Sequence, residues 1–459
     1  MALSAPTLES AATINPDGSR RFIHPATARG KFNTLRSISG VLLLGVYAAL
    51  PWIPINGHPA VFLDIADRRF HLFGLTLVTQ DLWLAFFLIT GTGFTLFYVT
   101  ALLGRVWCGW VCPQTVFLDV VRRIERLIEG DALKRRKLDA SPWTGMKTIQ
   151  RGLKQVLFAV FALALAHVFI SYFVSLPLLW KMMADSPFEH WGAFVFVFGM
   201  AAALWFDFAW FREQFCIVLC PYGRLQSVLM DNDTVTVGYD ARRGEPRGKK
   251  GTPGARDCVD CTRCVQVCPT GIDIRQGIQI ECIACAACID ACDDVMTKLG
   301  RPPGLIRYDS AHGFAGKKTR LLRPRTILYT VLLTIGATVM AFSVSTFRMA
   351  TVTISRMPGA PYYLTGADVR NQYLLRIINK KSEPEVFSVR MHGEAAGTQT
   401  SGTAELMPTE ALGEAIRPLV VTVSRLQFRP GQIVTIQVDS GDGQFHSEQQ
   451  MPFLGPNTP

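Results

Sequence analysis

The sequence predicts a polytopic α-helical membrane protein with a cysteine-rich polar module and a C-terminal β-sandwich. Three observations support this fold class. The 459 residues have a mean hydropathy of +0.23, which is too apolar for a soluble enzyme of this length and for a disordered chain. The 12 cysteines occur in repeated spacings, and the last part of the chain contains short strand-like runs. The formal net charge of +11 identifies no partner until the positions of the charges are known.

Five apolar stretches are long enough to cross a bilayer, which takes about 20 helical residues for roughly 30 Å of hydrocarbon. They are residues 37–56, 82–104, 154–176, 190–211 and 326–347. The first follows a 36-residue polar tail, which is too long for the n-region of an ordinary cleaved signal peptide, so we expect a retained membrane helix. The alternative is buried helices of a large soluble core, which five such runs with Trp and Tyr near their ends disfavour.

Basic residues concentrate in alternate connections between these stretches. The tail to residue 36 holds 5 Lys and Arg, the connection 105–153 holds 10 and the connection 212–325 holds 18, whereas 57–81 and 177–189 hold very few. Basic residues near helix ends are retained on the cytoplasmic side, so the N-terminus is predicted to be cytoplasmic and the C-terminus extracytoplasmic. The surplus positive charge therefore reflects membrane topology and not a nucleic-acid surface.

This topology divides the chain into parts. They are a cytoplasmic tail 1–36, a four-helix membrane region 37–211, a cytoplasmic region 212–325, a fifth helix 326–347 and an extracytoplasmic domain 348–459. Residues 239–257 are rich in Gly, Pro and basic side chains, which predicts a flexible tether. The basic run 134–137 lies beside the membrane, where attraction to anionic membrane lipid is worth about 1 kcal/mol per charge.

The extracytoplasmic domain contains no cysteine and five strand-like runs. The runs are MATVTISRM, NQYLLRIINK, EVFSVRMHG, AIRPLVVTVS and QIVTIQVDS, with Gly, Pro, Asn and Asp between them. Short, partly alternating runs over about 110 residues predict a small antiparallel sandwich of immunoglobulin type. We expect a docking or stabilising domain, because its isolated histidines, His392 and His446, are more typical of surface positions than of a metal site.

The strongest signal is a doubled cysteine run in the cytoplasmic region. The first half is CVDCTRCVQVCP from Cys258 to Pro269, and the spacing recurs from Cys282 to Cys292, with 13 residues between Cys268 and Cys282. In bacterial ferredoxins the fourth cysteine of each such run ligates the other cluster. The spacing therefore predicts a module at about 250–310 with two [4Fe-4S] clusters. One is held by Cys258, Cys261, Cys264 and Cys292, and the other by Cys282, Cys285, Cys288 and Cys268.

Zinc and disulfides are the alternatives for these eight cysteines. Zinc sites usually take four ligands in two pairs, and a reducing cytoplasmic location disfavours disulfides. The second run departs from the pattern in one place, since Asp293 and not proline follows Cys292. That position supplies no ligand, so the prediction of two clusters is unaffected.

The other four cysteines form an internal repeat of two CxxxCP motifs. Cys108 and Cys112 make the first pair, Cys216 and Cys220 the second, and each follows a membrane helix with an arginine three or four residues ahead. On a helix this spacing puts both thiols on one face, about 5–6 Å apart at their β-carbons, so the pairs could converge. Thiolates favour Cu(I), zinc or iron–sulfur centres. A third iron–sulfur cluster, a metal-free redox dithiol and simple packing of small side chains are alternatives.

These segments occur in a characteristic order. WCGWVCPQTVFLD and FCIVLCPYGRLQSVL follow membrane helices, CVDCTRCVQVCPTGIDIR and ECIACAACIDACDDVM come next, and GLIRY precedes the fifth helix. Together they resemble the cytochrome c oxidase accessory protein family CcoG, also called FixG or RdxA, over nearly the whole chain. Members of that family are described as membrane-bound dicluster ferredoxins and cupric reductases that assist assembly of cbb3-type cytochrome c oxidase.

The resemblance implies a bacterial inner-membrane protein whose N-terminus and clusters are cytoplasmic and whose immunoglobulin-like domain is periplasmic. It implies a copper site, with copper as substrate or bound cofactor, at Cys108, Cys112, Cys216 and Cys220. An unidentified donor would reduce one cluster, the other would relay the electron, and Cu(II) at the four thiols would become Cu(I). The product would pass to a copper chaperone, a transporter or a cbb3-type oxidase subunit.

Two other functions are open alternatives. A quinol-linked conduit to a partner reductase would need proton-handling groups, for which Asp207 and His167 are the intramembrane candidates. Asp207 could instead pair with Arg212, and His167 could bond a neighbouring helix. An assembly scaffold would use the sandwich to dock on the oxidase. The sequence contains no Gly-rich dinucleotide motif and no nucleic-acid-binding fold, so we expect neither NAD, flavin nor nucleic acid.

Overall fold

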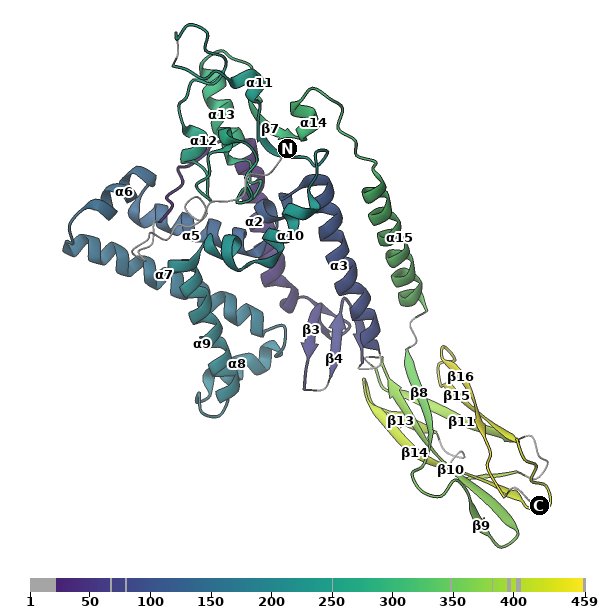
Figure 1. The fold of residues 1–459 in the computed structure, drawn as a ribbon. Helices are drawn as coiled ribbons and strands as arrows, with labels where there is room; N and C mark the ends of the chain where they lie inside the picture. The colour runs from purple at the N-terminus through teal and green to yellow at the C-terminus, as the bar shows by residue number, and fades with distance from the viewer. Residues whose placement is uncertain are drawn as a thin grey trace. The chain divides into compact units, whose positions relative to one another are not determined.

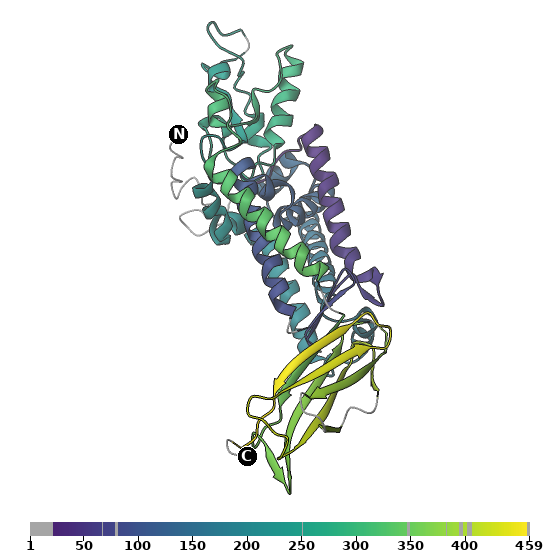
Figure 2. The same ribbon diagram turned by 90° about the vertical axis from the view of Figure 1, so that its right-hand side faces the viewer.

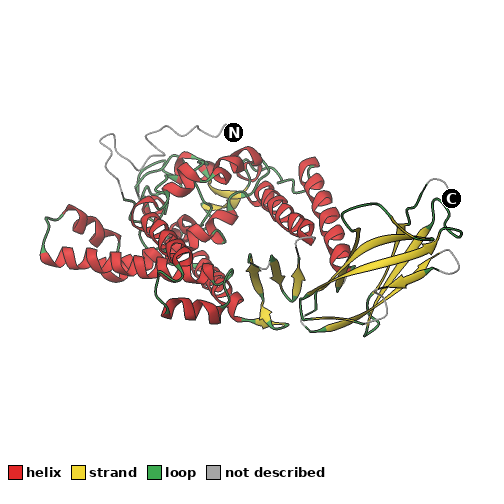
Figure 3. Ribbon diagram, turned by 90° about the horizontal axis from the view of Figure 1, so that it is seen from below, coloured by secondary structure: helices red, strands yellow, loops and turns green. Residues whose placement is uncertain are grey.

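The chain forms two compact units. The computed structural model describes residues 22–66, 68–78, 81–249, 251–346, 349–381, 383–393, 398–401 and 406–456. The first unit is mainly helical and consists of the residues up to Ile53, Val61–Leu63 and Trp83–Met340. The second unit is rich in strands and consists of Pro54–Ala60, Asp64–Leu82 and the chain from Ala341 onward. Figure 3 distinguishes the helices of the first unit from the strands of the second.

Among the described residues, five helices are long and apolar enough to cross a membrane, which confirms the predicted five-helix membrane protein (Figure 1). They are α2 (Lys31–Ala49), α3 (Leu82–Leu103), α7 (Gly145–Ile170), α9 (Trp191–Phe206) and α15 (Pro324–Ser345). Large apolar side chains remain exposed along them, for example Ile89 of α3 at 71 %. Lipid is the solvent that such surfaces require.

The first membrane helix begins at Lys31 and not at residue 37 as predicted. The carboxylate of Asp290, from the cysteine-rich region, accepts hydrogen bonds from the backbone N–H groups of Phe32 (3.2 Å) and Asn33 (2.7 Å). This carboxylate takes the place of a capping side chain, because Gly30 before the helix has none. Residues 31–36, which precede the predicted apolar stretch, therefore belong to the helix.

Shorter helices follow the membrane helices at their polar ends. They are α4 (Val106–Trp110), α5 (Pro113–Glu129), α6 (Ala132–Ala140), α8 (Leu176–Ala184) and α10 (Pro221–Leu229). Helix α5 is amphipathic, and its Leu118 and Val121 pack with Phe158 of α7 and with Phe208. The basic run 134–137 lies in α6, but it is not wholly the surface patch that we predicted. Arg135 is only 1 % exposed and forms a 2.6 Å ion pair with Glu125.

The cysteine-rich region folds around a small two-stranded sheet. Its elements are β6 (Thr236–Tyr239), α11 (Ala241–Gly244), α12 (Arg263–Gln266), α13 (Ala287–Lys298), β7 (Ile306–Asp309) and α14 (Ala311–Phe314). Strands β6 and β7 are antiparallel. The flexible tether predicted at 239–257 is therefore wrong. Its described residues include a strand end, a helical turn and the ion pair of Arg243 with Asp257 (2.5 Å).

The second unit contains the predicted immunoglobulin-like sandwich (Figure 2). One antiparallel sheet has the order β12-β14-β10-β8, with β9 also paired to β10, and the other has the order β13-β11-β15-β16. The strands are β8 (Ala350–Arg356), β9 (Tyr363–Thr365), β10 (Asp368–Asn379), β11 (Glu385–Gly393), β12 (Gln399–Ser401), β13 (Met407–Thr409), β14 (Glu414–Ser424), β15 (Ile433–Ser440) and β16 (His446–Pro452). All five predicted strands are confirmed.

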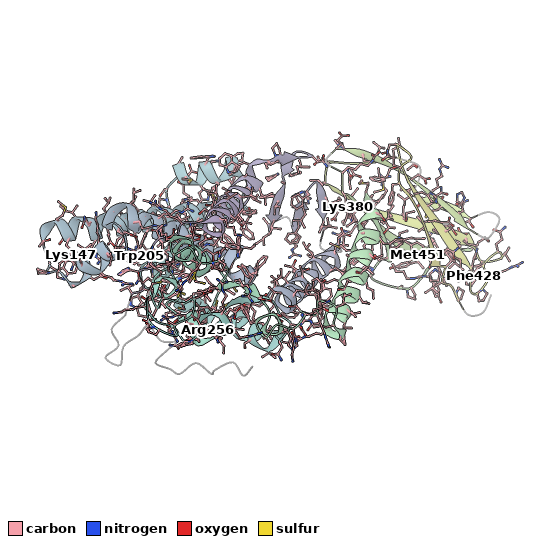
Figure 4. All side chains as sticks on the ribbon, turned by 90° about the horizontal axis from the view of Figure 1, so that it is seen from above. Lys147, Trp205, Arg256, Lys380, Phe428 and Met451 are labelled. Atoms are coloured by element: carbon pink, nitrogen blue, oxygen red, sulfur yellow. The ribbon has the colours of Figure 1, made fainter. Side chains whose placement is uncertain are left out.

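Alternation explains how these strands close a core. Leu375, Ile377 and Val421 are fully buried, while their neighbours along β10 and β14 are more exposed. Four short or polar strands were missed, among them β16, because its sequence HSEQQMP lacks that pattern. Lys380, Phe428 and Met451 belong to this unit and are labelled in Figure 4. Lys380 is buried and its ammonium lies 2.6 Å from Asp81, within the same unit.

Short strands also occur in the segment before α3. They are β1 (Pro54–Ile55), β2 (His58–Pro59), β3 (Val61–Asp64), β4 (Arg69–Leu72) and β5 (Leu75–Leu77). Strand β1 pairs with β2 and β4 with β5, both antiparallel.

Candidate metal and electron-transfer site

The two halves of the doubled cysteine run have the same backbone shape. The residues that flank Cys261 have φ angles of 54° and 56°, and those that flank Cys285 have φ angles of 52° and 62°. Such left-handed conformations are uncommon outside glycine. Their recurrence on both sides of each middle cysteine bends the two loops in the same way, as repeated ligand loops require.

Cys292 lies with the first three cysteines of the first run. It is one turn after Cys288 in α13. Its pKa is raised to about 12 by burial and then by the Cys264 thiol, the Asp293 carboxylate and the Cys258 and Cys261 thiols nearby. Groups that change the pKa of a thiol through their charge lie near it. This is the first of the two crossed groups that the spacing predicts.

The remaining four thiols line one cavity. They are Cys268 of the first run and Cys282, Cys285 and Cys288 of the second, and Cys264 of the first group also borders this cavity. Apolar side chains such as Ile283 complete its wall. Eight thiols in two groups of four fit the donor set of two [4Fe-4S] clusters, and the apolar wall would keep water from them.

The structure also brings the two CxxxCP pairs together. Burial raises the pKa of Cys216 to about 12, and the thiols of Cys112, Cys108 and Cys220 contribute to that rise. Burial likewise raises the pKa of Cys108 to about 11, with Cys112 and Cys220 among its neighbours. Although the two pairs are far apart along the chain, their four cysteines thus form one group of partly buried thiols. We call it the four-thiol site.

The second cysteine of each pair begins a helix. Cys112 is the N-cap of α5, Cys220 is the N-cap of α10, and a proline occupies the first turn in both. Burial raises the pKa of Cys112, while the backbone N–H groups of Thr115 and Gln114 lower it. Backbone donors and the positive end of a helix stabilise thiolate, which is the form that binds metal.

The arginine before each pair binds the helix that follows the other pair. Arg105, before the first pair, donates to the carbonyl of Gly223 in α10. Arg212, before the second pair, lies 2.6 Å from Glu125 in α5. Both arginines are buried, at 7 % and 3 % exposed. These crossed contacts join the two repeats, so the four-thiol site depends on both.

The residue after each Cys-Pro makes a second pair of crossed contacts. Gln114 donates from Nε2 to Asp207 at the end of the fourth membrane helix (2.7 Å). Tyr222 lies 2.6 Å from the hydroxyl of Thr100 in α3. Each repeat is therefore held at its Cys-Pro corner by the membrane helix of the other.

Irregular backbone surrounds the second pair. Both Asp207–Phe211 and Phe215–Leu219 are π-helical, and Arg212 between them has φ 51° and ψ −123°. A non-glycine residue in this region costs of order 1–3 kcal/mol, and π-helical turns are frequent at functional sites. The Glu125 ion pair holds the strained Arg212 in place and so sets the position of Cys216.

Gln226 contacts the four-thiol site from α10. Its side chain is fully buried, and its Oε1 accepts a hydrogen bond from the Cys108 thiol at 3.4 Å. Its Nε2 has no hydrogen-bond partner among the described residues. Rotation of the amide by half a turn would offer an N–H donor to a thiolate at the same place, so Gln226 suits either protonation state of Cys108.

The first CxxxCP motif lies directly against the second cluster loop. A β-carbon at Gly109 would come within 2.5 Å of the Ile283 carbonyl oxygen and 2.9 Å of the Cys285 Cα, so only glycine fits there. Cys108 packs against the same small apolar cluster that contains Cys285. Nearby, the Trp110 indole N–H donates to the Tyr308 hydroxyl (3.1 Å), which donates to the Ala284 carbonyl (2.6 Å).

Sequence reasoning missed these supporting residues. Gly109 and Gln226 belong to no recognised motif. A glycine or a glutamine in a helix can have many roles, so the sequence does not indicate which role these two residues have. The internal repeat was the one usable signal, because it indicated that elements near each pair would be related. Of the two intramembrane candidates, Asp207 binds Gln114. His167 bonds the carbonyl of Leu163 in its own helix, and in the part of the chain that the structure describes it has no bond to a neighbouring helix.

Comparison with known families divides the chain in a similar way. A 4Fe-4S dicluster domain matches residues 211–311, and an immunoglobulin-like fold at the C-terminus of FixG, described as a putative oxidoreductase, matches residues 340–456. A 4Fe-4S binding domain matches residues 83–135, which contain only Cys108 and Cys112.

Curated relatives extend the match to most of the chain. Protein RdxA of Cereibacter sphaeroides is 38 % identical over 81 % of this chain and 82 % of its own length. Nitrogen fixation protein FixG of Rhizobium meliloti is 34 % identical over 92 % of this chain and 90 % of its own length. A ferredoxin-type protein NapH of Escherichia coli is 25 % identical over 57 % of this chain and 87 % of its own length.

Proposed function

Because the chain belongs to the FixG and RdxA family of ferredoxin-type iron–sulfur membrane proteins, we propose that it is a cupric reductase that converts Cu(II) to Cu(I) at the four-thiol site. The observation that carries this proposal is the contact of Gly109 with Cys285, which joins the four-thiol site to a cluster loop. A thiol-rich site beside an electron carrier suits a soft metal that changes its charge by one.

Two [4Fe-4S] clusters, held by the crossed groups of Cys258, Cys261, Cys264 and Cys292 and of Cys268, Cys282, Cys285 and Cys288, would supply one-electron transfer. The chain's own residues give this transfer a direction. Cys261 is exposed and offers the first group to a soluble or quinone-linked donor. Cys285 is buried against the first CxxxCP motif, so the second group faces the acceptor.

Cu(II) is the substrate in this proposal. It takes up one electron and becomes Cu(I), while the donor loses one electron. Cys112 and Cys220 would bind the ion as thiolates, because each is the N-cap of a helix. Soft thiolates favour Cu(I) over Cu(II), so the same four side chains would retain the product until a copper chaperone, a transporter or an oxidase subunit accepts it.

The positions of the basic residues support a sidedness for this reaction. The connections that contain the four-thiol site and the doubled run are the strongly basic ones, so we place both in the cytoplasm and the sandwich in the periplasm. The sandwich is then available to subunits of a cbb3-type oxidase, and the reduced ion is released on the cytoplasmic face of the bacterial inner membrane.

A second candidate is an electron conduit with a third iron–sulfur cluster at the four-thiol site. It is favoured by the match of a 4Fe-4S binding domain to residues 83–135 and by the number of thiols, since four is the usual ligand count. Iron analysis separates the candidates, because two clusters contain about 8 iron atoms per chain and three contain about 12.

The decisive experiment uses the double variant Cys108→Ser/Cys216→Ser, purified anaerobically. We expect the iron content of the wild-type chain, reduction of the clusters by dithionite, and loss of their reoxidation by Cu(II). Ser227→Ala, on the same helix as Gln226, is the control and should be reoxidised like the wild type. Undiminished copper reduction by the double variant would refute the proposal, and loss of about 4 iron atoms would favour the third cluster.

A further inference from the structure

A pocket rich in arginine lies beside the second cluster loop. Its volume is about 280 Å³, and its walls come from residues 25–28, α2, α5, α6 and the cysteine-rich region. The charged side chains that line it are Arg36, Arg122, Arg123, Arg126, Arg135 and Asp119. All belong to the first unit. Asp119, Glu213 and Glu125 pair with Arg36, Arg122 and Arg135, so the surplus positive charge of this concave site comes from Arg123 and Arg126.

Three of these arginines have partners that fix them. Arg36 forms a bidentate pair with Asp119. Arg122 donates to the carbonyl of Pro269 (3.0 Å), and Arg135 pairs with Glu125. They form a rigid wall.

The other two arginines are held less firmly, although the carboxylates of Asp119 and Asp131 act on Arg126 from beyond ion-pair distance. Among the described residues, the side chains of Arg123 and Arg126 form no hydrogen bond and no ion pair. Burial lowers the pKa of Arg126, and the neighbouring Arg123 lowers it further. Arg123 is exposed and Arg126 is partly buried, so the free N–H donors of both guanidinium groups are available to an anion that enters the pocket from solvent.

We propose that this pocket binds a phosphate-bearing anion, held by Arg123 and Arg126. Guanidinium groups match phosphate oxygens in a bidentate manner and are the usual protein donors to them. The shared chemistry is a phosphate group, and it has two sources. A lipid headgroup can reach the pocket because Arg36 lies in the first turns of a membrane helix, and a soluble phosphate or pyrophosphate can enter from the polar side.

The pocket is connected to the second cluster loop on two sides. Burial raises the pKa of the Cys285 thiol, and the guanidinium of Arg36, which also pairs with Asp119, lowers it. Arg122 holds the carbonyl of Pro269, the residue after Cys268. A bound anion would therefore add negative charge next to the second cluster and make that cluster harder to reduce. This consequence rests on the proposed clusters, whereas the anion site itself does not.

The experiment compares two double variants of the full chain in neutral detergent. Arg123→Gln/Arg126→Gln removes the free guanidinium groups, and Lys134→Gln/Lys137→Gln removes the same charge from α6 positions outside the pocket. Pyrophosphate binding is measured by calorimetry, and retained phosphatidylglycerol by mass spectrometry after transfer from vesicles. Iron content and the melting temperature establish that both variants fold.

We expect the arginine variant to weaken binding of one of these probes by about tenfold or more, and the lysine variant to leave it within about twofold. Loss of pyrophosphate binding identifies a soluble ligand, and loss of phosphatidylglycerol alone identifies a lipid. Equal binding by both variants, or no binding of either probe by the wild type, overturns the proposal. In the wild type, binding of the anion should lower the reduction potential of one cluster. If the anion binds and that potential stays the same, only the proposed effect of the anion on the cluster is refuted.

Discussion

Gly109 and Cys285 are in direct contact, although they lie far apart along the chain. The missing side chain of Gly109 lets the first CxxxCP motif lie against the backbone of the second cluster loop. The rate of electron transfer falls steeply with distance, so the close approach of these two residues favours transfer between the two sites. It also means that the first CxxxCP motif and the second cluster loop pack as one structural unit.

The first prediction concerns this contact. Gly109→Ala should push the motif from the loop, because the added methyl group would lie under 3 Å from backbone atoms of Ile283 and Cys285. We expect cluster reoxidation by Cu(II) to slow by about tenfold or more, with normal iron content. Stopped-flow absorbance of the reduced chain measures the rate. Gly152→Ala is the matched control, since its new methyl group meets open space in α7; equal rates for the two variants would contradict us.

The second prediction concerns the buried carboxylate of α5. Glu125 accepts ion pairs from Arg135 and Arg212, and although burial raises its pKa, these arginines hold the pKa below its usual value. Glu125→Ala leaves two buried guanidinium groups without their partner. We expect it to lower the free energy of unfolding by about 3–5 kcal/mol. Thermal unfolding in detergent measures the loss. Lys298→Ala breaks only an exposed pair with Asp294 and should leave the melting temperature unchanged.

The third prediction concerns Gln226. Gln226→Leu keeps the volume and removes the hydrogen-bonding partner of Cys108. We expect Cu(I) affinity to fall by about five- to tenfold while cluster content stays normal, because one net hydrogen bond is worth about 1 kcal/mol. Competition with a Cu(I) chelator measures it. Gln226→Glu should not restore the affinity, because an ionised carboxylate offers the metal-bound thiolate no N–H donor. An unchanged affinity in Gln226→Leu would show that the amide is only packed there.

The fourth prediction separates the two units. Leu375 is fully buried in the sandwich. Leu375→Ala should lower the free energy of unfolding of the sandwich by about 2–5 kcal/mol, because it leaves a cavity. The exposed Leu426, at 98 %, provides the control Leu426→Ala. We expect a lower melting transition for the sandwich with unchanged cluster spectra. A loss of clusters together with the sandwich would instead show that the units fold as one.

The fifth prediction tests the proposed sidedness. Ser401→Cys places a thiol on an exposed strand of the sandwich, and Lys298→Cys places one on an exposed part of α13. A membrane-impermeant maleimide added to intact cells should label only Ser401→Cys above the background of the unchanged chain. Labelling of Lys298→Cys alone would reverse the topology.

Local chemistry could be predicted from the sequence. Eight cysteines at ligand spacing, five apolar runs and five alternating strands each depend on neighbours within about 20 residues, so their patterns are visible along the chain. The crossed contacts of Arg105 and Arg212 could not be predicted, because they depend on the packing of helices that are far apart along the chain. The start of α2 was predicted wrongly for the same reason, because the carboxylate that caps this helix belongs to Asp290, which is far away along the chain.

The crossed arginines also impose an order on biogenesis. The ribosome completes the first CxxxCP motif long before Glu125 can meet Arg212 and before Gly223 can accept from Arg105. Until the fourth membrane helix has been inserted, the nascent chain has half a thiol site and a carboxylate without one of its counter-charges. Cofactor loading should therefore follow membrane insertion, and a truncated translation product should expose this unfinished surface to quality-control proteases.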